Sequence, residues 1–256
     1  MTYAVMQTGL NSPSIEQLEN AFLQVPGVTA MDANILGRDA HGVLVKGFEL
    51  GRASAMQSAL AAQGVETEVV EDKTLAELPQ AMQLNKVDFS PEAFLIYDLV
   101  GRSIPLDWNS ISVIAAGRAR MTEFTTEPAT RFAASPAKDN EARLASARQT
   151  KEEQKDHLLL EIITRGATHR YNTVADRPEA VFLFQSLGER RCKEPLLNLA
   201  MFVQELAKFA PAAALNYGAY QLCENRDATF TYRSKTAFYR EISWLLWMLS
   251  TGRMQQ

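Results

Sequence analysis

The sequence predicts an α+β protein of two modules joined by a short linker. Helical and strand periodicities alternate over residues 1–72, and from Phe89 a series of apolar strands is followed by helices. Charge is also distributed unevenly along the chain: residues 1–80 hold four Lys/Arg and ten Asp/Glu, whereas the remaining residues hold 22 Lys/Arg and 20 Asp/Glu. A chain of 256 residues is long enough for two domains. We therefore expect modules over residues 1–72 and 89–256, with a linker over 73–88.

The N-terminal module begins with the apolar run Tyr3–Met6, which predicts a strand. Ser14, with Gln17 three residues later, has the spacing of a helix N-cap followed by its capping-box partner. The elements expected, in order, are a strand at 3–6, a helix at 14–24, strands at 28–36 and 43–45, a helix at 50–63 and a strand at 65–70. This βαββαβ order is the split βαβ, or ferredoxin-like, arrangement.

Two segments of this module resemble heavy-metal-associated domains. Leu18–Val28 (LENAFLQVPGV) is similar to one conserved stretch of that family, and Ala59–Glu66 (ALAAQGVE) is similar to the end of its closing helix. The resemblance implies the ferredoxin-like fold. That family binds metal through a CxxC after the first strand, but the matching loop, Thr8–Ser14, has no Cys, His or Met. We therefore expect a metal-free interaction or regulatory module.

The second module is expected to be strand-rich and to end in helices. Predicted strands lie at 94–100, 111–115, 121–126, 158–164, 170–174 and 181–187, and predicted helices at 195–209, 212–223 and 235–249. Pro195 fits the first position of a helix. Residues 127–154 lack an apolar face and are interpreted as an insertion, a long loop followed by a solvated helix.

The opening of this module resembles a bacterial pleckstrin-homology-like (PH-like) domain. Phe94–Asp98 and then Ile104–Ile111 (IPLDWNSI) are similar to its first strand and the apolar segment that follows. The resemblance implies an antiparallel β-barrel closed by a helix. Members that bind phosphoinositides carry several Lys/Arg in the first hairpin, whereas this hairpin has Arg102 alone. Lipid binding is therefore not implied.

The bulk composition excludes several classes of protein. A net charge of −4 argues against a dedicated nucleic-acid binder, which needs a basic excess. The first residues lack the pattern of a secretory signal, and no apolar stretch is long enough to span a membrane. Cys192 and Cys223 lack CxxC spacing, so we expect buried thiols in a cytoplasmic protein.

No motif predicts a metal, a cofactor or a catalytic centre. His41, His157 and His169 are far apart in sequence, and no nucleotide-binding or nucleophile-elbow pattern occurs. The one basic cluster, at Arg190, Arg191 and Lys193, precedes the helix that starts at Pro195. Together with His169 and Arg170, and with Arg165 as a further member, it predicts an anion site at a helix N-terminus. The alternative is a solvated turn with Glu189 and Glu194 as counter-ions.

The C-terminal helix is apolar nearly all round. Trp244 and Trp247 lie three residues apart, so the helix must pack on its own chain or associate with a second copy. We expect a non-catalytic binding, scaffold or regulatory protein with an unknown protein partner. The alternatives are an enzyme of unrecognised type, which would use Arg190, Arg191 and a histidine on an anionic substrate, or peripheral membrane binding through the PH-like domain.

Overall fold

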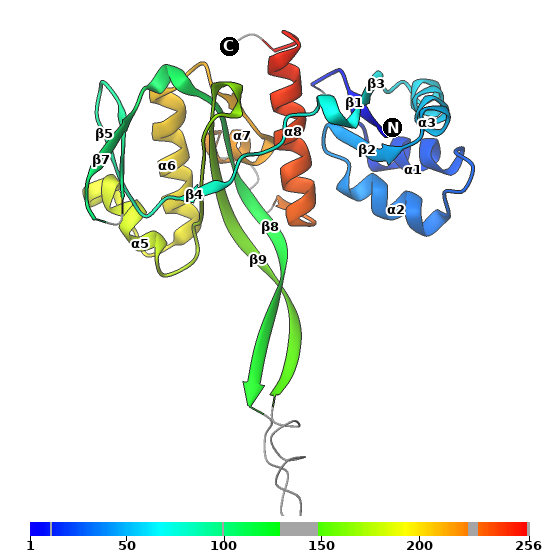
Figure 1. Cartoon of the computed structure of the whole chain (residues 1–256). Coiled ribbons are helices and arrows are strands. Elements are labelled where there is room, and N and C mark those ends of the chain that lie inside the picture. The colour runs from blue at the N-terminus through cyan, green and yellow to red at the C-terminus, as the bar shows by residue number, and fades with distance from the viewer. Residues whose placement is uncertain (11, 99, 129–147, 225–229, 255–256) are drawn as a thin grey trace, which may run out of the picture.

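The computed structural model describes residues 1–10, 12–98, 100–128, 148–224 and 230–254, with the backbone alone at 38, 125–128 and 148–151. It is a mixed helix and sheet structure, as predicted. An N-terminal module and a larger second module lie on either side of the C-terminal helix, and a two-stranded hairpin projects from the second module (Figure 1).

The N-terminal module is a three-stranded antiparallel sheet covered by helices. Its central strand β1 (Tyr3–Gln7) pairs with β2 (Val43–Phe48) on one side and with β3 (Thr67–Glu71) on the other. The helices are α1 (Ile15–Leu23), α2 (Ala30–Asp39) and α3 (Leu50–Ala62). Ser14 and Gln17 form the predicted capping box at the start of α1.

Residues 28–36, expected as a strand, form most of helix α2 instead. Thr29 caps this helix: its hydroxyl accepts from the Asp32 backbone N–H, and the Asp32 carboxylate accepts from the Thr29 N–H. A reciprocal cap of this kind stabilises a helix start more than the few apolar residues here favour a strand. The order is therefore βααβαβ with three strands, so the predicted βαββαβ order was wrong.

The second module is built on a sheet with the order β11-β8-β9-β10-β4, and β12 pairs with β8. Its long strands are β8 (Ile111–Pro128) and β9 (Arg148–Thr164), and β10 (Arg170–Val174) lies antiparallel to β9. Three short strands run parallel to their neighbours: β4 (Ala81–Gln83), β11 (Ala214–Leu215) and β12 (Thr231–Tyr232). The 3-10 turn η3 (Arg165–Ala167) joins β9 to β10.

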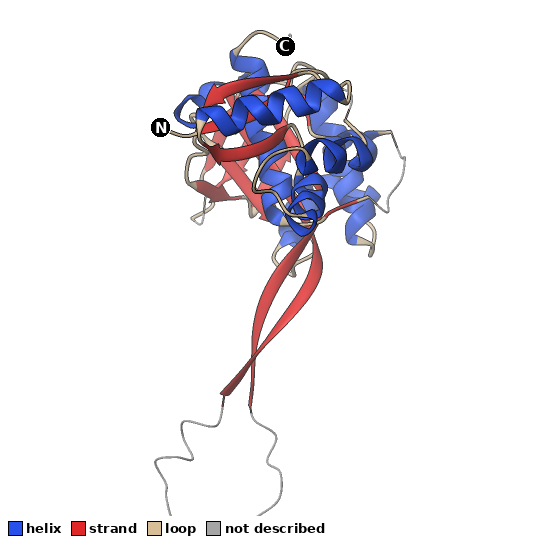
Figure 2. Ribbon diagram, turned by 90° about the vertical axis from the view of Figure 1, so that its right-hand side faces the viewer, coloured by secondary structure: helices blue, strands red, loops and turns tan. Residues whose placement is uncertain are grey.

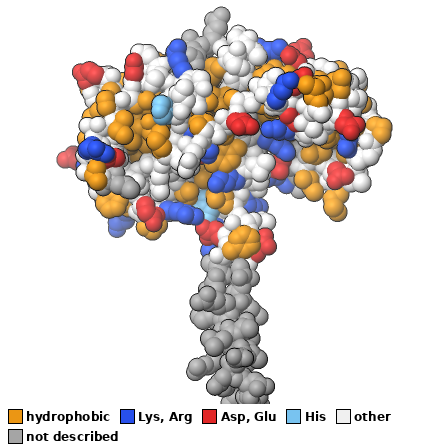
Figure 3. Space-filling model, in the orientation of Figure 1, with side chains coloured by type: hydrophobic (Ala, Val, Ile, Leu, Met, Phe, Trp, Pro, Cys, Tyr) orange, Lys and Arg blue, Asp and Glu red, His pale blue; other side chains and the backbone are white. Residues whose placement is uncertain are grey.

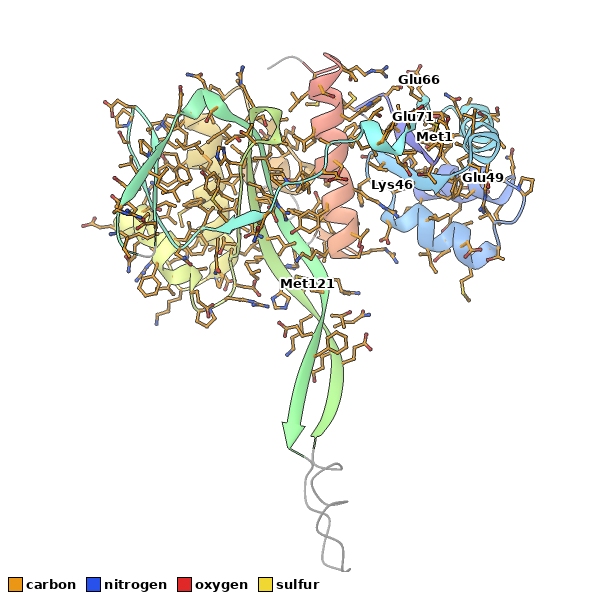
Figure 4. The ribbon with its side chains drawn as sticks, in the orientation of Figure 1. Met1, Lys46, Glu49, Glu66, Glu71 and Met121 are labelled. Carbon is orange, nitrogen blue, oxygen red and sulfur yellow. The ribbon has the colours of Figure 1, made fainter. Side chains whose placement is uncertain are left out.

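Strands β8 and β9 continue beyond the body as a two-stranded arm (Figure 2). Met121, labelled in Figure 4, lies where the arm leaves the body. The pairing continues from Arg120 opposite Asp156 to Pro128 opposite Arg148. Residues 148–154, expected within a solvated insertion, are therefore strand, because they pair with the Thr-rich segment 122–128. Residues 127 and 128 of the expected insertion are also strand, at the end of β8, and residues 129–147 lie outside the described residues.

A smaller sheet covers the far side of this module. It contains β5 (Lys86–Phe89), β6 (Phe94–Tyr97) and β7 (Ser103–Leu106), and the 3-10 turn η2 (Trp108–Ser110) leads on to β8. Helix α6 (Pro195–Phe209) packs between the two sheets through Leu199, Phe202 and Leu206. In the described chain the two sheets share no strand pair, so they do not close into the expected barrel.

Residues 181–187, expected as a strand, are helical. They fall in α5 (Ala180–Leu183) and the 3-10 segment η4 (Phe184–Arg190). Leu183, Phe184 and Leu187 are buried at helical spacing, a pattern that a short apolar run does not distinguish from a buried strand. The predicted helix at 212–223 starts later, as α7 (Tyr217–Cys223), because residues 214 and 215 add strand β11 to the sheet.

Helix α8 (Lys235–Ser250) lies between the two modules (Figure 1). Its buried residues share one cluster with Ala4 and Met6 of β1 and with Val113 and Ala115 of β8. The opposite face of the N-terminal sheet packs on α1 and α3. Of the two alternatives that the sequence left open, the structure shows packing of this helix on its own chain. The apolar face that suggested self-association is covered within one chain.

The expected linker, residues 73–88, is also part of the packed structure. It begins within the 3-10 turn η1 (Asp72–Thr74) and contains β4 and most of β5. Leu75 is buried in the cluster around α8, and Leu84 is buried in the cluster around α6. The segment therefore runs between the modules and also contributes a strand to the large sheet.

Candidate anion-binding site

A hollow of about 380 Å³ lies in the second module where the end of β10, helix α5 and the start of α6 meet. Its lining residues are Ala175, Asp176, Arg177, Pro178, Val181, Phe184, Arg191, Cys192, Lys193, Pro195 and Asn198. Two loops contribute its charged groups: the turn after β10 and the loop before α6. Elsewhere, charges of both signs are interspersed over the face drawn in Figure 3. The hollow itself is lined by three cations and one carboxylate, Asp176.

The three cations are Arg177, Arg191 and Lys193, and all three are exposed. Within the part of the chain that the structure describes, Arg191 and Lys193 form no ion pair. Arg177 does form an ion pair: its Nη2 donates a hydrogen bond of 3.5 Å to Oε1 of Glu123. Arg191 and Lys193, which have no counter-ion among the described residues, contribute a positive potential at the hollow that favours an anion there.

Asn198 holds the loop that carries two of these cations. It is 5% exposed, its Oδ1 accepts from the Cys192 N–H at 2.9 Å, and its Nδ2 donates to the Cys192 carbonyl oxygen at 2.8 Å. Asn198 thereby fixes the backbone between Arg191 and Lys193. Helix α6 begins there with Pro195, and Glu194 supplies no side-chain cap, so the positive end of the helix dipole adds to the same potential.

Asp176 is the carboxylate among these lining residues, and its oxygens are engaged elsewhere. Oδ1 accepts from the Leu158 N–H at 2.9 Å, and Oδ2 lies 3.0 Å from Nδ1 of His157. Nε2 of His157 lies 3.1 Å from Oε1 of Glu123, so the ring sits between two carboxylates at the base of the arm. Both oxygens of Asp176 therefore have partners outside the hollow, although its negative charge lies among the three cations.

The predicted site residues are only partly brought together. Arg191 and Lys193 line the hollow, but Arg190 turns away and pairs with Glu205 at 2.7 Å. Arg170 lies at the start of β10, whereas the hollow follows the end of that strand, and its guanidinium pairs with Glu161. His169 is exposed, with its ring stacked against Tyr171.

Arg177 replaces them and was missed. It lies between the predicted strands at 170–174 and 181–187, and the signal that could have found it was its position directly after a strand of the predicted core. Arg165 lines a different hollow of about 400 Å³, beside Leu246 and Leu249 of α8. The expectation of buried thiols was wrong for Cys192, which is exposed at the edge of the cationic hollow.

Glu161, the first of two buried carboxylates that resemble catalytic groups, is fully engaged. It is 2% exposed and accepts two hydrogen bonds from the Arg170 guanidinium, at 2.7 and 2.9 Å. The Tyr239 hydroxyl donates a third hydrogen bond at 2.6 Å. Burial, followed by the charge of Glu161, raises the pKa of Tyr239 far above its ordinary value. This network joins α8 to the sheet.

The second buried carboxylate, Glu241, accepts from the Tyr232 hydroxyl and, at 2.7 Å, from the Tyr217 N–H. Burial raises the pKa of Glu241. The Tyr232 oxygen also accepts from the Asn216 side chain at 2.9 Å and from the Gly218 N–H at 3.0 Å. A Cβ on Gly218 would lie 2.2 Å from the Ala116 carbonyl oxygen, so these groups leave no space for a substrate.

Comparison with known proteins finds no matching family model, no similar curated protein and no similar solved structure. Across the described residues, no helix combines the length and apolarity needed to cross a bilayer. Nor does that part of the chain group three or more His, Cys, Asp or Glu side chains in a way that could hold a metal ion.

Proposed function

We propose that the protein is a non-catalytic binding protein that holds an anionic ligand in the hollow formed by the end of β10, α5 and the start of α6. One observation carries the proposal: Arg191 and Lys193 line the hollow together, and neither forms an ion pair with the described residues. Arg177 and the α6 N-terminus support it. Asn198 keeps the loop in place before any ligand arrives, which reduces the ordering cost of binding.

The second candidate is an enzyme that acts on an anion at the same place. The Cys192 thiol lines the hollow, and the paired His157 and Asp176 lie behind it. The binding function is preferred because His157 does not line the hollow, and its Nε2 is buried 3.1 Å from a Glu123 carboxylate oxygen. A general base for a ligand in the hollow would need that nitrogen free.

Peripheral membrane binding has less support. Arg102, the cation of the β6–β7 hairpin, pairs with Asp98 at 2.8 Å. The ferredoxin-like and PH-like resemblances carry no part of the proposal, because each module has helical residues where a strand was predicted. These are α2 in the N-terminal module, and α5 with the 3-10 segment η4 in the second module.

Isothermal titration calorimetry with pyrophosphate, a compact polyanion, at low ionic strength tests the proposal. The variant Arg191→Ala/Lys193→Ala should lose about tenfold or more in affinity, since the loss of even one charge-assisted contact costs roughly 1.5–3 kcal/mol. Arg190→Ala is the matched control, because Arg190 is adjacent in sequence but pairs with Glu205 outside the hollow. Equal affinities for the two variants, or no binding by the unmodified protein, would overturn the proposal.

A further inference from the structure

Apolar side chains form much of the wall of the cationic hollow. Ala175 and Phe184 are 2% and 3% exposed, and Pro178 and Pro195 also line the hollow. Val181 of α5 lines it too and is 50% exposed. Val181 thus supplies apolar surface at the hollow that is open to solvent. Contact with a ligand would remove that surface from water.

Val181 and Phe184 come from a different segment of the chain than the cations of the hollow. Arg177 precedes helix α5 in the chain, and Arg191 and Lys193 follow η4, so the cations flank the segment that supplies Val181 and Phe184. The hollow has a volume of about 380 Å³, which lies within the range of sites for small organic ligands, roughly 300–1,000 Å³. A bare inorganic anion would neutralise the rim and leave the apolar wall uncovered.

We infer that the ligand of this hollow is a small amphiphilic acid, with one anionic group between Arg177, Arg191 and Lys193 and an apolar body against Val181 and Phe184. This inference rests on the proposed function and adds the chemical class of the ligand. Burial of the apolar body displaces water from around the acid group, which strengthens its attraction to the cations. The apolar body of such a ligand therefore strengthens the binding of its acid group.

Calorimetric titrations with octanoate, acetate and octanamide separate the two contributions. Octanoate should bind at least about tenfold more tightly than acetate, which lacks the apolar body, and than octanamide, which lacks the charge. Val181→Ser should weaken octanoate binding about threefold to tenfold and leave pyrophosphate binding unchanged. Phe182→Ser is the matched control, because Phe182 is the next residue and 55% exposed but does not line the hollow.

The outcomes distinguish this inference from the proposed function. If pyrophosphate binds but octanoate binds no more tightly than acetate, the amphiphile is rejected and the anion site stands. If neither pyrophosphate nor octanoate binds, both are rejected. Octanoate binding that survives Arg191→Ala/Lys193→Ala would place it on another apolar surface and overturn the inference. A further outcome is that the protein floats with phosphatidylglycerol vesicles in a manner that depends on Arg191 and Lys193, without binding octanoate. That outcome would reject the free acid and identify a membrane surface as the ligand.

Discussion

The indole Nε1 of Trp244 donates a hydrogen bond of 2.7 Å to the backbone carbonyl oxygen of Gln7, across 237 positions of sequence. Trp244 is 6% exposed and lies midway along α8, while Gln7 ends the central strand of the N-terminal sheet. The bond satisfies a buried polar group on each partner. It also fixes how the N-terminal module sits on the helix that covers the second module.

Gly42 makes the approach of Trp244 possible. Gly42 has a φ of +70°, and a Cβ there would lie 2.1 Å from the indole Cγ. We expect Gly42→Ala to lower the free energy of unfolding by more than about 3 kcal/mol, because the clash involves a buried ring. Gly47→Ala is the control: Gly47 has a φ of +84° with nothing within 4 Å, so it should cost only about 1–2 kcal/mol.

Urea unfolding of the two glycine variants, followed by tryptophan fluorescence, measures the difference. The two backbones are similarly strained, so the excess cost of Gly42→Ala reports the contact with Trp244. Equal costs would contradict the described packing of the N-terminal module on α8.

The His41 ring lies where the N-terminal module packs on the second module, and it makes the folding stability sensitive to acid. The ring contacts Tyr232 edge-on, with the ring centroids 5.3 Å apart, and burial lowers the pKa of His41 below its ordinary value. As the pH falls below about 6.5, the unfolded chain binds this proton before the folded chain does. The stability that neutral His41 contributes is therefore present above that pH and is lost as the pH falls through the folded pKa.

Unfolding free energies at pH 7 and pH 5 test this expectation. The decrease between the two values should be smaller in His41→Phe, which retains an aromatic ring, than in the unmodified protein. His169→Asn, at an exposed position, should leave the decrease unchanged. A His41→Phe variant with the full decrease would show that other groups account for the acid sensitivity.

Asn216 caps α7 and links this helix to β8 and β12 through side-chain hydrogen bonds. Its side chain is fully buried, and Oδ1 accepts from the backbone N–H groups of Ala116 and Ala219, both at 2.9 Å. Asn216→Ala should cost about 3 kcal/mol, because it leaves the buried N–H of Ala116 without its acceptor. Asn34→Ala removes one half-buried hydrogen bond to Glu19 and should cost about 1 kcal/mol. Urea midpoints that rank the two variants in the reverse order would contradict the proposed importance of this network.

Elements with their own local signals could be predicted from the sequence. The capping box at Ser14, Pro195 at the start of α6 and the apolar spacing of α8 each identify a helix whatever surrounds it. Residues 181–187 could not be assigned, because an apolar run of that length is buried either as a strand or as helical turns. The tertiary environment decides between the two.

The candidate site was half predicted for a similar reason. Arg191 and Lys193 are close in sequence to the helix they precede, so composition revealed them. Arg177 joins them only through the fold. Arg170 is removed from them by Glu161, a partner nine residues away that pairing between β9 and β10 brings near. Charge clusters in a sequence show which groups are present but not which of them are already neutralised.

The arm formed by β8 and β9 should be dispensable for folding of the body. None of the described residues between 124 and 152 belongs to the three hydrophobic clusters, and Phe124 is 69% exposed. Replacing residues 124–152 with Asn-Gly, a favoured two-residue hairpin turn, joins Glu123 to its strand partner Glu153 and keeps the contacts of His157. The melting temperature should change by less than about 4 °C, equivalent to roughly 1 kcal/mol.

Leu159→Ala provides the comparison within the same strand. Leu159 is 3% exposed in the cluster around α8, so its truncation should cost about 2–5 kcal/mol, more than removal of the whole outer arm. Sedimentation velocity on the shortened protein then shows whether the arm joins two copies. A shift from dimer to monomer would make the arm an assembly element. Loss of cooperative unfolding on shortening, with Leu159→Ala better tolerated, would contradict the expectation and show that the outer arm stabilises the body.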